Sequence, residues 1–126
     1  MIIRQMNDDD IKKLKETYKK FYSKHFEFPD FSKFFGSYVV IDTNSNEIIT
    51  AGGVRPIAES VLITDKSKSN FKRVKALYEM LEYQKHICKE NNLDQLHAFV
   101  GNSKWKKHLI NIGFKNCKGD ALYLDV

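Results

Sequence analysis

Three titratable side chains in this sequence could act as a general base. Glu59 begins a short apolar segment, His97 lies within another, and His108 lies in a helix-forming stretch near the C-terminus. A carboxylate or an imidazole can accept a proton from a nucleophile that lies within hydrogen-bond reach, directly or through one water. Each residue also has a simpler interpretation. Glu59 would be a surface carboxylate at a turn, His97 a hydrogen-bonded core histidine and His108 an exposed helix residue.

A second group of residues could bind phosphate. Basic side chains and hydroxyls gather where a helix is expected to begin, at Lys66, Ser67, Lys68, Ser69, Lys72 and Arg73. A helix N-terminus presents unpaired N–H groups and a partial positive charge, which suit a diphosphate. The alternative is a plain basic helix cap. No Cys/His spacing resembles a zinc site, so no metal is expected.

The elements that must position these groups follow from the hydrophobic pattern. The predicted strands are Ile2–Met6, Tyr38–Ile41, Ile48–Val54, Ser60–Thr64, Leu96–Val100, Phe114–Cys117 and Ala121–Val126. The first predicted helix begins at Asn7 or Asp8 and ends near Lys24. The second begins at Ser69 or Asn70 and ends at Asn91 and Asn92, and the third begins at Asn102 or Ser103 and ends at Gly113. Residues 25–35 are expected to form a loop that holds at most one short helix.

Composition bounds the class of protein. The chain of 126 residues is long enough for one domain, and 42% hydrophobic residues are enough to build a core. Trp105 and the Phe and Tyr stripes alternate with apolar helix positions, so they are interpreted as core or cleft walls, not as a stacking set for nucleic acid. The two cysteines, Cys88 and Cys117, form no CxxC pair. This cysteine usage and the absence of a signal peptide or a long apolar run indicate a cytoplasmic protein without a membrane span.

The formal net charge is +5, from 21 Lys and Arg against 16 Asp and Glu. A basic balance favours anionic partners. No helix shows the basic and polar face of a groove-reading protein, so any binding of nucleic acid is expected to be weak and unspecific.

The order of the predicted elements indicates an α/β (α+β) fold with a mixed, largely antiparallel central sheet and helices on both faces. Three segments also resemble the Gcn5-related N-acetyltransferase (GNAT) superfamily. They are Ile3–Met6 followed by an acidic helix cap at residues 8–10, Glu47–Gly53, and Leu96–Asn102 leading to Gly113 and Phe114. The resemblance covers nearly the whole chain and implies a single GNAT-like domain over residues 1–126.

The resemblance implies an acetyl-CoA-dependent N-acetyltransferase that acts on an amine of a small molecule or protein, as a monomer or homodimer. Glu59 and His97 would be the catalytic residues. The cofactor-binding residues would be Leu62, Ile63, Thr64, Lys68, Ser69, Asn70, Phe71, Lys72, Arg73 and Asn102. Phe71 and Arg73 stand where the family has small residues, and Leu109 stands where it often has a tyrosine. The alternatives are a degenerate member that binds CoA or a protein partner without turnover, and a small nucleic-acid-binding protein.

Overall fold

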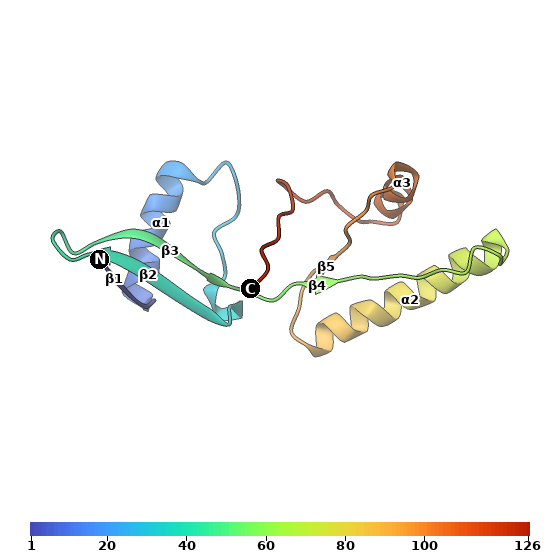
Figure 1. Ribbon diagram of the computed structural model, residues 1–126, viewed down its shortest axis with the longest axis horizontal. Coiled ribbons are helices and arrows are strands. Elements are labelled where there is room, and N and C mark those ends of the chain that lie inside the picture. Colours follow the sequence, from blue (N-terminus) through green and yellow to red (C-terminus); the bar gives the residue numbers. More distant parts are fainter. The chain divides into compact units, whose positions relative to one another are not determined.

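The structure, a computed structural model, describes all residues from Met1 to Val126, which form two compact units, Met1–Pro56 and Ile57–Val126. Each unit has its own small sheet (Figure 1). The predicted α+β class is confirmed, with three α-helices, a three-stranded antiparallel sheet and a two-stranded parallel sheet. The single domain over residues 1–126 stays a prediction. None of the helices combines the length and apolar character needed to cross a bilayer.

The sheet of the first unit is a meander of three strands, β1 (Ile2–Gln5), β2 (Gly36–Asp42) and β3 (Glu47–Val54), in the order β1-β2-β3. Asn46 adopts a φ of 59° in the turn between β2 and β3, a left-handed conformation that asparagine tolerates well. The register shifts between Val40 and Ile41, where β3 carries an extra residue. A short 3₁₀ turn, η1 (Phe31–Lys33), precedes β2.

Helix α1 (Asp8–Phe21) begins with a capping box. The side chain of Asn7 accepts a hydrogen bond from the Asp10 N–H at 3.0 Å, and the Asp10 carboxylate accepts one from the Asn7 N–H at 2.9 Å. Asp10 also accepts two hydrogen bonds from the guanidinium of Arg4 on β1, at 2.6 and 2.9 Å. One buried carboxylate therefore caps the helix and ties it to the sheet.

The core of the first unit lies between α1 and one face of the sheet. Arg4 and Val39 are register partners, so their side chains share a face, and the pairing of Arg4 with Asp10 shows that this is the face toward α1. Val39 is fully buried on this face, and Ile41 lies two residues further along the same strand.

The second unit contains β4 (Ala58–Glu59), α2 (Asn70–Glu90), β5 (Leu96–His97) and α3 (Ser103–Asn111), with β4 and β5 paired in parallel. Its helix ends follow the predicted signals. Ser69 and Asn102 are the N-caps, and Asn92 and Gly113 have φ values of 57° and 111° where the helices end.

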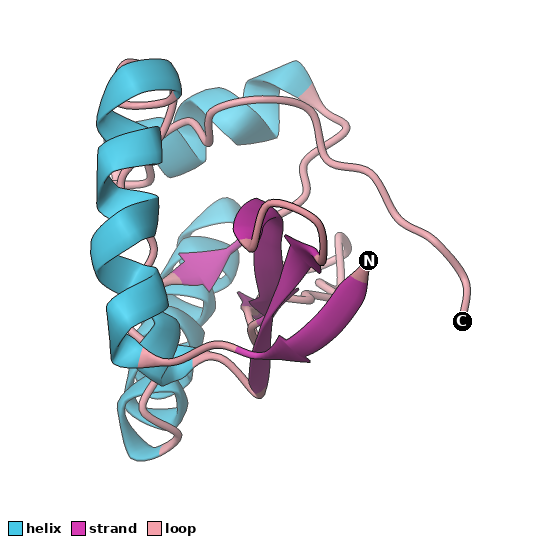
Figure 2. Cartoon of the chain, turned by 90° about the vertical axis from the view of Figure 1, so that its left-hand side faces the viewer, coloured by secondary structure: helices cyan, strands magenta, loops and turns pink.

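Several predicted strands are wrong in extent. Ser60–Thr64 belongs to no strand, Leu96–Val100 is reduced to β5, and the predicted strands at 114–117 and 121–126 are absent. The stretch after α3 runs as a loop (Figure 2). Its side chains at Leu122, Tyr123 and Leu124 are 87–93% exposed. These segments have the composition of strands, but a strand needs a hydrogen-bonded neighbour, which composition does not supply.

The hydrogen bonds from Arg4 and from the Asn7 N–H lower the pKa of Asp10, which is 2% exposed. A lowered folded-state pKa stabilises the fold above the unfolded value of about 3.9, and this contribution is lost as the pH falls through the folded pKa. We expect Asp10→Asn to lower the free energy of unfolding at pH 7 by roughly 2 kcal/mol, because the helix cap and the charged hydrogen bonds are both weakened.

Urea unfolding of the wild-type protein and Asp10→Asn between pH 7 and pH 2.5 checks this expectation. The difference between the two proteins should shrink toward the acid end. Asp9→Asn is the matched control, because Asp9 lies in the same helical turn and is exposed. Equal effects of the two substitutions would show that Asp10 has no special role.

Candidate functional site

The candidate site begins where the parallel ladder of β4 and β5 ends. Ala58 pairs with Leu96 and Glu59 with His97, and the last bond of the ladder runs from the Ser60 N–H to the His97 carbonyl at 2.8 Å. Beyond it, the backbone groups of residues 61–64 and 98–101 make no backbone hydrogen bond. The two segments therefore leave the sheet with polar backbone groups still available.

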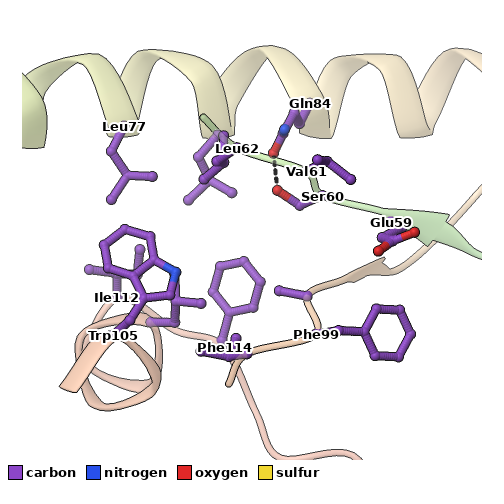
Figure 3. A pocket seen from close by; sticks show the side chains of 14 residues that line it. Glu59, Ser60, Val61, Leu62, Leu77, Gln84, Phe99, Trp105, Ile112 and Phe114 are labelled. Carbon is purple, nitrogen blue, oxygen red and sulfur yellow. Dashed lines mark hydrogen bonds between the residues drawn. The ribbon is translucent and has the colours of Figure 1, made fainter. Parts of the chain in front are cut away.

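A cavity of about 240 Å³ lies between these two segments, α2 and α3. Side chains of α2 project toward those of α3 and Phe114 across the space (Figure 3). Most of the side chains that line it are apolar, polar atoms supply at least an equal share of its surface, and Glu59 lies near one end. The complete lining comprises Glu59, Ser60, Val61, Leu62, Leu77, Leu81, Gln84, Ala98, Phe99, Val100, Trp105, Leu109, Ile112 and Phe114.

One polar pair interrupts the apolar wall. The Ser60 hydroxyl donates a hydrogen bond to the side-chain oxygen of Gln84 at 2.8 Å, and both residues line the cavity (Figure 3). The bond holds the first residue beyond β4 against the middle of α2. Apolar side chains with a few fixed polar groups among them are the usual lining of a small-molecule site.

The two predicted bases are register partners on neighbouring strands. Glu59 is exposed and lines the cavity. His97 is half-buried and lines an adjoining cavity of about 490 Å³, which shares five lining residues with the first: Ala98, Phe99, Val100, Leu109 and Phe114. The Nδ1 atom of His97 is buried without a hydrogen-bond partner. The register thus brings together two groups that lie far apart in the sequence, although they line different cavities.

The predicted phosphate loop lies at the start of α2, outside the cavity lining. The Ser69 hydroxyl is engaged as the N-cap, accepting from the Lys72 N–H at 3.3 Å. Hydrogen bonds from the side chain and the backbone of Ser67 lower the pKa of Asp65, whose carboxylate lies 3.8 Å from the Lys68 ammonium. This carboxylate offsets part of the positive charge that the lysines bring.

The remaining members of the predicted cofactor set have different positions. Leu62 lines the cavity, whereas Ile63 is 99% exposed and Thr64 is also exposed outside the lining. Phe71 is 78% exposed, and Asn70 accepts a hydrogen bond from Arg73. Asn102 is engaged as the N-cap of α3, accepting from the Trp105 N–H at 3.1 Å. Leu62 is therefore the member of this set that contacts the cavity.

On α3, Leu109 is buried and lines both cavities, so no titratable group stands at this position. His108, the third candidate base, stacks on Trp105 with ring centroids 5.3 Å apart. Its Nε2 atom is buried without a partner.

Ser60 and Gln84 are site residues that the sequence alone does not indicate. The sequence features that mark these two residues are weak. Gln84 interrupts the apolar face of α2, and a polar side chain at such a position needs a partner. Ser60 is a hydroxyl residue at the end of an apolar run, but only the fold shows that it meets Gln84.

Comparison of the chain with protein-family models, with curated proteins and with solved structures finds no match in any of the three.

Proposed function

We propose that this chain is an acetyl-CoA-dependent N-acetyltransferase that transfers an acetyl group to an amine. The proposal depends on the end of the β4–β5 ladder, where two chain segments separate around a cavity and keep backbone groups without backbone hydrogen bonds. The resemblance of the sequence to GNAT proteins supports the same assignment.

The cavity and its backbone suit the pantetheine arm of CoA. That arm is an extended chain with amide groups, and an extended ligand can take up the hydrogen bonds that a neighbouring strand would otherwise make. Backbone N–H and C=O groups without a backbone partner lie on both sides of the cavity, in residues 61–64 and 98–101. Their recognition needs no particular side chain, which allows this function in a sequence that lacks the family's glycines.

The start of α2 suits the diphosphate. Helix N-termini attract anions, and Lys66 and Lys72 are exposed there. Leu77, the first α2 residue in the cavity lining, follows Asn70 by roughly 10 Å along the helix axis at 1.5 Å per residue. An extended ligand can therefore reach from the cavity to the helix terminus.

When bound, acetyl-CoA would supply the thioester whose carbonyl carbon the neutral amine attacks. Glu59 would accept the amine's proton, directly or through a water, as the new C–N bond forms, the C–S bond breaks and CoA leaves as a thiolate that takes its proton from water. The Leu62 N–H would donate to the thioester oxygen as negative charge develops on it. His97 is the substitute base, because it is the register partner of Glu59.

A second candidate function is binding of CoA without turnover. Binding without turnover is supported by Leu109, because a buried leucine at this position of α3 cannot protonate the departing thiolate. The two functions share the cavity and differ in whether thiol is released.

The first test is binding. We expect calorimetry to detect acetyl-CoA at low salt and the affinity to fall as salt rises, because exposed lysines are screened. The double variant Lys66→Glu/Lys72→Glu should weaken binding several-fold. Lys104→Glu/Lys107→Glu on α3 changes the net charge equally and should leave binding nearly unchanged. Absence of heat and of a thermal shift at millimolar acetyl-CoA would refute the cofactor assignment.

The second test is turnover, measured as thiol release against an amine panel over a range of pH. Glu59→Gln should lower kcat on the order of 10²-fold while acetyl-CoA affinity stays nearly constant. Glu79→Gln, an exposed glutamate of α2 outside the cavity lining, is the matched control. If His97→Ala has the large effect and Glu59→Gln has none, the base is His97. Binding without thiol release in the wild type would favour the second function.

A further inference from the structure

The first unit contains one of the basic stretches of the protein, and residues 66–75 of the second unit carry an equal net charge. Residues 12–26, on α1 and the loop after it, contain six lysines against one glutamate. Their net charge therefore equals the formal net charge of +5 of the whole chain. All six lysines are exposed.

The same stretch exposes a group of aromatic rings. Phe21 is 58% exposed, and Tyr22 and Phe26 are each 47% exposed. The ring centroids of Phe21 and Tyr22 are 6.5 Å apart, and those of Tyr22 and Phe26 are 5.4 Å apart. We call these three residues the aromatic platform. Their exposure shows that these rings are not core residues, so of the two interpretations of the Phe and Tyr stripes only that of cleft walls stays a prediction for them.

Contacts with Tyr18 hold the aromatic platform in place. Half-buried Tyr18 donates a hydrogen bond from its hydroxyl to the Phe26 carbonyl, and its ring contacts those of Phe26 and Phe28 at centroid distances of 5.8 and 5.4 Å. The Phe26 N–H in turn donates to the Tyr22 carbonyl at 3.4 Å. These contacts connect the end of α1 to the following loop and keep the exposed rings grouped.

Cations lie beside these rings. The Lys20 ammonium lies 5.1 Å from the centroid of the Phe21 ring, and Lys19 and Lys24 are exposed nearby in the sequence. Exposed aromatic rings beside lysines match the two elements of single-strand recognition, which are stacking of bases and neutralisation of phosphates.

We propose that the aromatic platform and its lysines bind single-stranded nucleic acid without sequence preference. This inference goes beyond the proposed acetyltransferase and rests on the first unit alone. Stacking explains the exposed rings, since every base has an apolar face, and the lysines supply charge complementarity to the phosphates. Insertion into a membrane is less well supported, because the aliphatic residues Ile11 and Leu14 of α1 are half-buried rather than presented to a bilayer.

The experiment is fluorescence anisotropy of a labelled oligothymidylate of about 12 nucleotides, within the range of single-strand site sizes. The full-length protein should bind it, with an affinity that falls as salt rises. Phe21→Ala and Tyr22→Ala should each weaken binding by about fivefold or more. Phe35→Ala is the matched control, since Phe35 is 80% exposed and lies outside the platform.

Charge variants distinguish binding at the aromatic platform from non-specific attraction of the nucleic acid to the basic protein. Lys19→Glu/Lys20→Glu should weaken binding and reduce the salt dependence by about 0.7 in the logarithmic slope for each phosphate that is no longer neutralised. Lys104→Glu/Lys107→Glu on α3 should have little effect. Equal weakening in both variants, an unchanged affinity in Phe21→Ala and Tyr22→Ala, or binding to anionic phosphatidylserine vesicles but not to the oligonucleotide would overturn the proposal. Thermal unfolding of each variant excludes loss of fold as the cause.

Discussion

The last hydrogen bond of the β4–β5 ladder, from the Ser60 N–H to the His97 carbonyl, is the interaction on which the candidate site depends. A parallel ladder that continued would pair the backbone of both segments and leave no cavity between them. Because it stops, the two segments part and the cavity opens. The Ser60 hydroxyl also reaches Gln84 on α2, so the residue that ends the ladder fixes one wall. The proposed chemistry requires this arrangement.

The two units hold their elements together by different means. In the first, a buried carboxylate at Asp10 joins the cap of α1 to Arg4 on β1, and Val39 provides the fully buried centre. In the second, the buried apolar residues Leu81, Cys88 and Leu109 all come from helices. The short ladder contributes little to this core.

Sequence analysis predicted features that depend on local signals. The N-caps at Asn7, Ser69 and Asn102 and the positive φ of Gly113 follow from the chemistry of a few adjacent residues. The hairpin of β2 and β3 also follows, because its turn residues are consecutive. The strand at Ser60–Thr64 was wrong, because whether an apolar segment becomes a strand depends on a neighbour elsewhere in the chain.

The candidate site was predictable only in part for the same reason. Glu59 and His97 were chosen separately, and only the strand register shows that they are paired. The Ser60–Gln84 bond joins residues 24 positions apart, which no local pattern reveals. The apolar residues of α1 have helical spacing, which does not show how deeply each is buried: Ile11, Leu14 and Tyr18 are half-buried, whereas Phe21 and Tyr22 are exposed.

The most direct test of the central claim is hydrogen–deuterium exchange of the full chain with and without acetyl-CoA. The claim is that a ligand completes the backbone hydrogen bonds that the β4–β5 ladder leaves unmade. It predicts slower exchange in peptides that cover residues 61–64 and 98–101 when acetyl-CoA is added, and much less slowing with adenosine diphosphate, which lacks the pantetheine arm. Unchanged exchange in both segments at saturating acetyl-CoA, or slowing confined to residues 1–56, would contradict the claim.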